Sequence, residues 1–164
     1  EFMDFAFRRR DGYLAALSKH SIDPAPALMR QGEMTELLGH QSAQEMLALA
    51  DPPTAILTSS MVTAIGVRRA IQEAGLQMGR DVSVITHDDE LAYLKNGQNV
   101  PLFTATRSSV RAAGRCAADM LLRMISNPGC GPLHTLLEAE LILGNSTGPA
   151  PTSVDTKTLR QGQT

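Results

Sequence analysis

Cysteine is scarce in this sequence. Among its 164 residues, only Cys116 and Cys130 carry a thiol. The pair matches no CxxC motif and no other spacing typical of metal ligands. A disulfide scaffold or a zinc module is therefore excluded, and two reduced thiols favour a cytoplasmic protein.

Long apolar runs and blocks of basic residues are also missing. No apolar stretch approaches the length that spans a bilayer, so we expect no membrane partner. The net charge is −2 and no five consecutive residues are basic. This argues against nucleic-acid binding by this segment on its own.

The N-terminal stretch "EFMDFAFRRRDGY" lacks the apolar core of a signal peptide and carries acids where a signal peptide carries bases. The sequence does not begin with Met, so we expect a fragment of a longer protein. Apolar residues make up 43% of the chain and charged residues 20%, a composition typical of one globular domain with a real core.

The order of apolar and polar residues predicts an α/β fold. A strand, a helix and a strand follow one another within residues 54–86 and form a βαβ unit. Its nearly all-apolar strands predict a parallel sheet that is covered on both faces. The expected helices are 7–19, 41–50, 61–79 and 108–129, and the expected strands are 27–33, 54–60, 81–86, 102–106 and 134–144.

Polar residues gather where two of the predicted strands end. "TSS" occupies positions 58–60, and "THDD" occupies positions 86–89. In an open α/β sheet, ligands bind outside the carboxyl ends of the strands. Both strands belong to one βαβ unit, so we expect Ser60 and Asp88 to border a common crevice.

Several kinds of chemistry are possible for "THDD". His87, Asp88 and Asp89 are consecutive, so their side chains diverge and are poorly placed to close on one metal ion. A general acid–base pair needs two carboxylates that face one gap, which neighbours at a strand end do not guarantee. A phosphate-accepting domain needs a lysine after a later strand, and "LFTATRSS" offers none.

Motifs of catalysis and of nucleotide binding are absent from the sequence. It contains no GxSxG, GxGxxG or GxxxxGK[ST] pattern. We therefore expect no enzyme, no metal and no cofactor. The remaining role is ligand recognition, in which a carboxylate accepts hydrogen bonds from adjacent hydroxyls of a sugar and an arginine donates to it.

Structural roles remain open for the same residues. Asp88 could cap the turn that follows it, although strand alternation favours Asp89 for that role. Ser60 could cap the next helix, contact a ligand, or do both. The run of three arginines before Asp11 could be a solvated helix end, and His87 either lines a pocket or is a hydrogen-bonded structural residue.

Several segments, taken in order, carry a resemblance to a known family. They are "RRRDGYLAAL" (8–17), the block from "PPTAILTSS" to "VSVITHDD" (52–89), "PLFTAT" (101–106), "AAGRCAADMLL" (112–122) and "LEAELILGNST" (137–147). Together they resemble the effector-binding domain of LacI/GalR-family bacterial transcription regulators. This domain has two Rossmann-like subdomains of the periplasmic-binding-protein-like type I fold, and a small effector, usually a sugar, binds between them.

The resemblance implies an incomplete two-subdomain fold for this chain. Residues 1–147 would be the C-terminal part of the effector-binding domain, and 148–164, rich in Pro, Thr and Gln, a flexible tail. Residues 5–100 and 134–144 would lie mostly in the second subdomain, while 102–126 would cross to the first. A homodimer would reach operator DNA only through an N-terminal headpiece that this chain lacks.

The resemblance also implies a set of effector-binding residues. The arginine of the family's R-x-x-G motif falls on Arg9, its asparagine on Ser60, and the first aspartate of its acidic pair on Asp88. A position where an aromatic residue often lines the pocket falls on Met34. We also include His87 among the expected ligand-binding residues, as a residue that could line the pocket. Serines replace the usual Asn-Asp pair, and Gly144 replaces an arginine, so the saccharide itself is not identified.

The sequence thus predicts the effector-binding part of a sugar-responsive transcriptional repressor. The alternative is a periplasmic sugar-binding protein of an ABC importer, which shares the fold. The N-terminus of the full gene product distinguishes the two, because a headpiece indicates a regulator and a signal peptide indicates transport.

Overall fold

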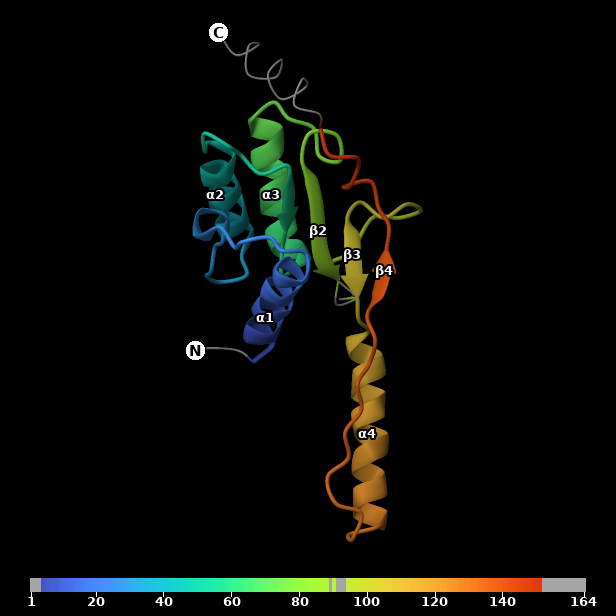
Figure 1. The fold of residues 1–164 in the computed structure, drawn as a ribbon. Helices are drawn as coiled ribbons and strands as arrows, with labels where there is room; N and C mark the ends of the chain where they lie inside the picture. The colour runs from blue at the N-terminus through green and yellow to red at the C-terminus, as the bar shows by residue number, and fades with distance from the viewer. Residues whose placement is uncertain (1–3, 89, 91–93, 152–164) are drawn as a thin grey trace.

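The structure is a computed structural model that describes residues 4–88, residue 90 and residues 94–151 (Figure 1). Within these residues, no helix combines the length and apolar character needed to cross a membrane. Asp89 and most of the predicted tail, residues 152–164, lie outside the described part of the chain.

The centre of the fold is a four-stranded sheet in the order β1-β2-β3-β4. Its strands are β1 (Ala55–Leu57), β2 (Ser83–Asp88), β3 (Thr104–Arg107) and β4 (Glu140–Ile142). The first three are parallel, as predicted, and β4 is antiparallel to β3. The sheet is therefore mixed, because the chain runs out along a helix after β3 and returns in the opposite direction (Figure 1).

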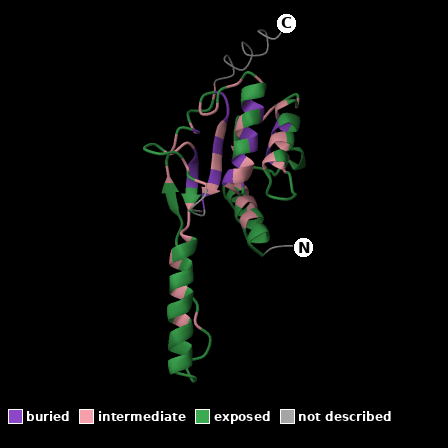
Figure 2. Cartoon of the chain, turned by 180° about the vertical axis from the view of Figure 1, so that it is seen from behind, coloured by how far each residue is buried: buried purple, intermediate pink, exposed green. Residues whose placement is uncertain are grey.

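Two helices, α2 (Glu36–Leu47) and α3 (Met61–Glu73), build the core against the sheet. Each begins at a hydroxyl cap, since the Thr35 side chain accepts from the Leu38 N–H and the Ser60 side chain from the Thr63 N–H. The buried core joins α3 to β2 and to the residue before β3, and its members are Ala43, Ala64, Val67, Ala70, Ile71, Val82, Val84 and Phe103 (Figure 2).

Along β2, buried residues alternate with half-buried ones. Val84 is buried whereas Ile85 is half-buried, and Leu57 at the end of β1 is 61% exposed. The described residues therefore bury one face of the sheet more fully than the other. The prediction of cover on both faces is not met within this part of the chain.

The segment 27–33, which was expected to be a strand, is not one. Pro26–Leu28 forms a short 3-10 turn, η1, and the following residues are irregular. The guanidinium of Arg30 donates to the carbonyl oxygens of Ala27 at 2.9 Å and Met29 at 3.1 Å. These are carbonyls that a sheet ladder would otherwise use, so a local side chain replaces a strand partner.

Two further helices lie outside this core. Helix α1 spans Asp4–Lys19 and has no buried residue. Helix α4 spans Val110–Ser126 and projects away from the sheet, with the segment after it running back alongside it (Figure 1). The helix that the sequence predicted at 108–129 is present within those bounds, yet none of its residues is buried (Figure 2).

Residues just after β4 are held firmly in the sheet. Ser146 is fully buried, donates through Oγ to the carbonyl oxygen of Val84, and accepts from the Thr104 N–H at 2.8 Å. The N–H of Gly148 donates to Ser83 Oγ at 3.2 Å. The first residue of the predicted tail is thus hydrogen-bonded to β2.

Candidate ligand-binding site

The carboxyl ends of the parallel strands carry a series of hydroxyl groups. Thr58 follows β1 and its Oγ1 donates to Thr86 Oγ1 of β2 at 2.8 Å, an interaction buried between the two strands. The Ser60 carbonyl accepts from the same Thr58 hydroxyl at 3.3 Å. Ser60 and the end of β2 therefore border one edge of the sheet, as the βαβ topology predicted.

Ser60 itself caps α3. Its Oγ accepts from the Thr63 N–H at 3.3 Å and lies 3.0 Å from Thr63 Oγ1. The capping role that the sequence left open is thus present in the structure. The hydroxyl retains spare hydrogen-bonding capacity, because a serine oxygen has two lone pairs and one proton.

Arg9 reaches the same edge from α1. Its Nη1 donates to the carbonyl oxygen of Ser59 at 2.7 Å, and its guanidinium lies 4.9 Å from the centroid of the Phe5 ring. Arg9 is half-buried, whereas Arg8 and Arg10 are exposed. One arginine of the triplet therefore faces the sheet, and the neighbouring two form the solvated surface of the helix.

Asp88 is the last residue of β2 and is 4% exposed. Its Oδ1 accepts from the Glu90 N–H at 2.9 Å, so Asp88 holds the turn that follows the strand. The division of roles expected between Asp88 and Asp89 is not tested, because Asp89 lies outside the described residues. Glu90 has a left-handed backbone, with φ of 58°, which this hydrogen bond supports.

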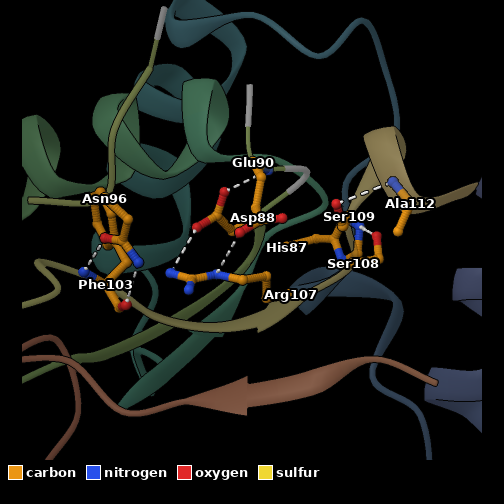
Figure 3. A network of polar contacts seen from close by, with 9 residues as sticks. All are labelled: His87, Asp88, Glu90, Asn96, Phe103, Arg107, Ser108, Ser109 and Ala112. Carbon is orange, nitrogen blue, oxygen red and sulfur yellow. Dashed lines mark hydrogen bonds and ion pairs between the residues drawn. The ribbon is translucent and has the colours of Figure 1, made fainter. Parts of the chain in front are cut away.

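Arg107, the last residue of β3, is paired in register with Asp88. Its Nη2 lies 3.5 Å from Asp88 Oδ2, and its Nε lies 4.0 Å from Glu90 Oε1 (Figure 3). This residue was missed as a site residue because the predicted strand ended at residue 106. Extending the strand by one residue would have placed Arg107 at the same carboxyl edge.

His87 lies on the opposite face of β2 from Asp88, because successive side chains of a strand alternate. Its Nδ1 is 3.0 Å from Thr106 Oγ1. Its Nε2 is 3.0 Å from Ser108 Oγ (Figure 3). It therefore links the end of β2 to β3 and to the short segment between β3 and α4. The structural role that the sequence left open for His87 is observed.

Met34 lies directly before the cap of α2 and is 44% exposed. It packs into no part of the described core. Across the described ranges, no group of three or more His, Cys, Asp or Glu side chains gathers to hold a metal ion.

The comparisons with known proteins identify the family. The periplasmic binding protein-like domain family matches residues 4–147. This chain belongs to that family. Among curated relatives, the HTH-type transcriptional regulator AglR of Rhizobium meliloti is 47% identical over 92% of this chain and 42% of its own length. The repressor CytR of Escherichia coli is 30% identical over 92% of this chain and 43% of its own.

Solved structures agree with this assignment. The lac repressor dimer bound to operator and an anti-inducer is 29% identical, with a TM-score of 0.74 over 86% of this chain and 47% of that one. A LacI family regulator from Enterococcus faecium with bound ribose is 25% identical, with a TM-score of 0.69 over 87% of this chain and 52% of that one.

The resemblance to the LacI/GalR effector-binding domain is confirmed by these matches. The relatives are regulators rather than enzymes, and none of those named here is an importer's binding protein. The importer alternative therefore finds no support. The chain spans less than half the length of the curated relatives it matches.

Proposed function

We propose that this chain is the C-terminal part of the effector-binding domain of a sugar-responsive, cytoplasmic transcriptional repressor. The observation that carries the proposal is a buried carboxylate, Asp88, beside a guanidinium at the carboxyl edge of a parallel sheet. It occurs in a family member whose named relatives are HTH-type regulators. A headpiece outside this chain reads operator DNA, and the full-length protein is a homodimer.

The shape of α4 supports the expected division into subdomains. The helix extends away from the sheet, has no buried residue, and follows β3 directly (Figure 1). We propose that 102–126 crosses to the first subdomain of the same effector-binding domain, and that this subdomain covers the apolar stripe of α4. The relatives are more than twice as long as the part that this chain matches, so their additional residues are long enough to form such a subdomain.

The ligand is proposed to be a saccharide held by Arg9, Ser60 and Asp88, with Met34 and His87 at the border of the pocket. Carboxylate, guanidinium and hydroxyl groups together accept from and donate to the hydroxyls of a sugar. The ribose in the Enterococcus faecium regulator is consistent with this ligand class. Binding between the subdomains would favour one arrangement of the dimer and thereby change its affinity for operator DNA.

A direct test is saccharide binding by the full-length protein. A thermal-shift screen of mono- and disaccharides identifies a ligand, and calorimetry then measures its affinity for Asp88→Asn and Arg9→Ala variants. Each loses a charge-assisted hydrogen bond, so we expect affinity to fall roughly ten- to a hundredfold.

Matched controls come from the same chain. Arg8→Ala removes the neighbouring arginine, whose partner is the exposed Asp4, and Asp23→Asn alters an acid of the exposed loop. Both controls should bind as the unsubstituted protein does. The proposal is wrong if no saccharide binds, or if the Asp88 and Arg9 variants bind with unchanged affinity.

A further inference from the structure

The link between the sheet and α4 is held at its start by the side chain of His87. The imidazole Nε2 lies 3.0 Å from the hydroxyl of Ser108, the first residue after β3. We propose that His87 is a positioning residue that anchors Ser108 to the sheet, so that the hinge between the two subdomains begins at Ser109. This rests on the proposed function, in which residues 102–126 cross from the second subdomain to the first.

Ser108 is held by β2 in two ways. Its backbone N–H donates to the carbonyl oxygen of Asp88 at 3.2 Å, and its side chain meets the His87 ring. Two successive residues at the end of β2 thus hold both the backbone and the side chain of Ser108 (Figure 3). Ser108 therefore moves with the sheet rather than with the helix that follows it.

The next residue, Ser109, already belongs to the helix end. Its Oγ accepts from the Ala112 N–H at 3.2 Å, and α4 begins at Val110 (Figure 3). The backbone of Ser109 is extended, with φ of −87° and ψ of 105°. A single extended residue therefore separates the anchored Ser108 from a rigid helix, and a change in its dihedral angles would swing α4 as a body.

The anchor lies back to back with the proposed ligand site. His87 and Asp88 are consecutive residues of β2, so their side chains project from opposite faces of the sheet. Asp88 is the carboxylate proposed to bind the saccharide, and its backbone carbonyl accepts from Ser108. A shift of the end of β2 on ligand binding would therefore pass directly to the link.

The two ring nitrogens of His87 have different partners, which allows them to be separated. Nδ1 lies 3.0 Å from Thr106 Oγ1, whereas Nε2 meets Ser108. A glutamine amide reaches about as far from the backbone as Nε2, and an asparagine amide about as far as Nδ1. His87→Gln therefore keeps the contact with Ser108, and His87→Asn keeps only the contact with Thr106.

The test is hydrogen exchange of the full-length protein, resolved to single amides around residues 104–112. In the unsubstituted protein, protection should extend through the Ser108 amide. His87→Asn and Ser108→Ala both remove the anchor, so the Ser108 amide should exchange about fivefold faster in each. His87→Gln should retain the protection.

The controls distinguish anchoring from a general loss of packing. Thr106→Val removes the hydroxyl beside Nδ1 at an exposed position and should leave the Ser108 amide protected. The double variant of His87→Asn with Ser108→Ala should exchange no faster than either single variant, because both remove one interaction. A merely structural role for His87 would instead speed exchange in β1 and β2 as well, and equally for Gln and Asn.

The anchoring is refuted if His87→Gln and His87→Asn exchange alike at Ser108, or if Ser108→Ala leaves this amide protected. Should His87→Asn fail to fold, Ser108→Ala decides by itself, because it deletes only one hydroxyl. Failure of every saccharide to bind would overturn the proposed function and the role of the link in closure. The exchange pattern would still decide whether His87 holds Ser108.

Discussion

Single polar residues join segments of this chain that are far apart in sequence. The Ser146 hydroxyl bridges Val84 of β2 and Thr104 of β3, at the point where the two strands come together. The Thr58 and Thr86 hydroxyls link β1 to β2. Because a buried polar group without a partner costs about 1–3 kcal/mol, such contacts fix the relative position of the strands that form the site.

The Asp81 carboxyl has a lowered pKa, so it is the group through which we expect the stability of the fold to depend on acidic pH. A hydrogen bond from Arg80 lowers the pKa of its carboxyl most, the backbone N–H of Gln77 lowers it further, and partial burial opposes both. A carboxyl with a lowered pKa in the folded state stabilises the fold above its ordinary pKa of about 3.9. That stabilisation disappears as the pH falls below this value and through the folded-state pKa.

We therefore expect Asp81→Asn to be less stable than the unsubstituted protein at pH 7, by about 1 kcal/mol. The difference should shrink when the pH is lowered from 4 toward 2. Urea unfolding at a series of pH values measures it, and Asp51→Asn, at an exposed position, serves as the control. A stability difference that does not vary with pH would show that Asp81 acts through packing alone.

At the scale of elements, α2 and α3 cross unusually closely. A Cβ added to Gly66 would lie 2.0 Å from the carbonyl oxygen of Glu36, and one added to Gly39 would lie 2.2 Å from that of Thr63. These neighbours are backbone atoms, so they cannot move aside as a flexible side chain would. The Gly39–Gly66 crossing fixes α3, and with it the Ser60 cap at the site.

Gly66→Ala should accordingly separate the helices and destabilise the protein by about 1–3 kcal/mol, despite the better helix propensity of alanine. The urea midpoint measures the loss. Gln72→Ala introduces the same residue at an exposed position of α3 and should leave the midpoint nearly unchanged. Equal midpoints for the two variants would contradict the close-crossing explanation.

At the scale of the whole molecule, the described structure is a packed α/β body with α4 extending from it (Figures 1 and 2). Leu121, Leu122 and Ile125 of α4 are 57%, 61% and 66% exposed. Contiguous exposed apolar side chains mark a surface that is normally covered. This agrees with the proposal that another subdomain packs against α4.

We expect the 164-residue chain by itself to self-associate through this helix. Sedimentation velocity should show oligomers at micromolar concentrations, and the double variant Leu122→Glu with Ile125→Lys should shift them toward monomer. Arg115→Gln, at another exposed position of α4, should leave association unchanged. A monomeric parent chain would contradict the assignment of this surface.

Sequence patterns determined the elements and their caps, because helix and strand periods and capping hydroxyls act over a few residues. They correctly placed the βαβ unit and Asp88 at a carboxyl strand edge, and they offered the capping of α3 as one of the roles open to Ser60. The family followed from ordered motifs, and the comparisons confirmed it.

Only the tertiary structure decided what depends on register and on distant partners. It made β4 antiparallel to β3 and set Arg107 beside Asp88. Local sequence could not specify these features, because each depends on which strand lies next to which. The pairing of β2 with β3 places a guanidinium beside the buried Asp88 carboxylate.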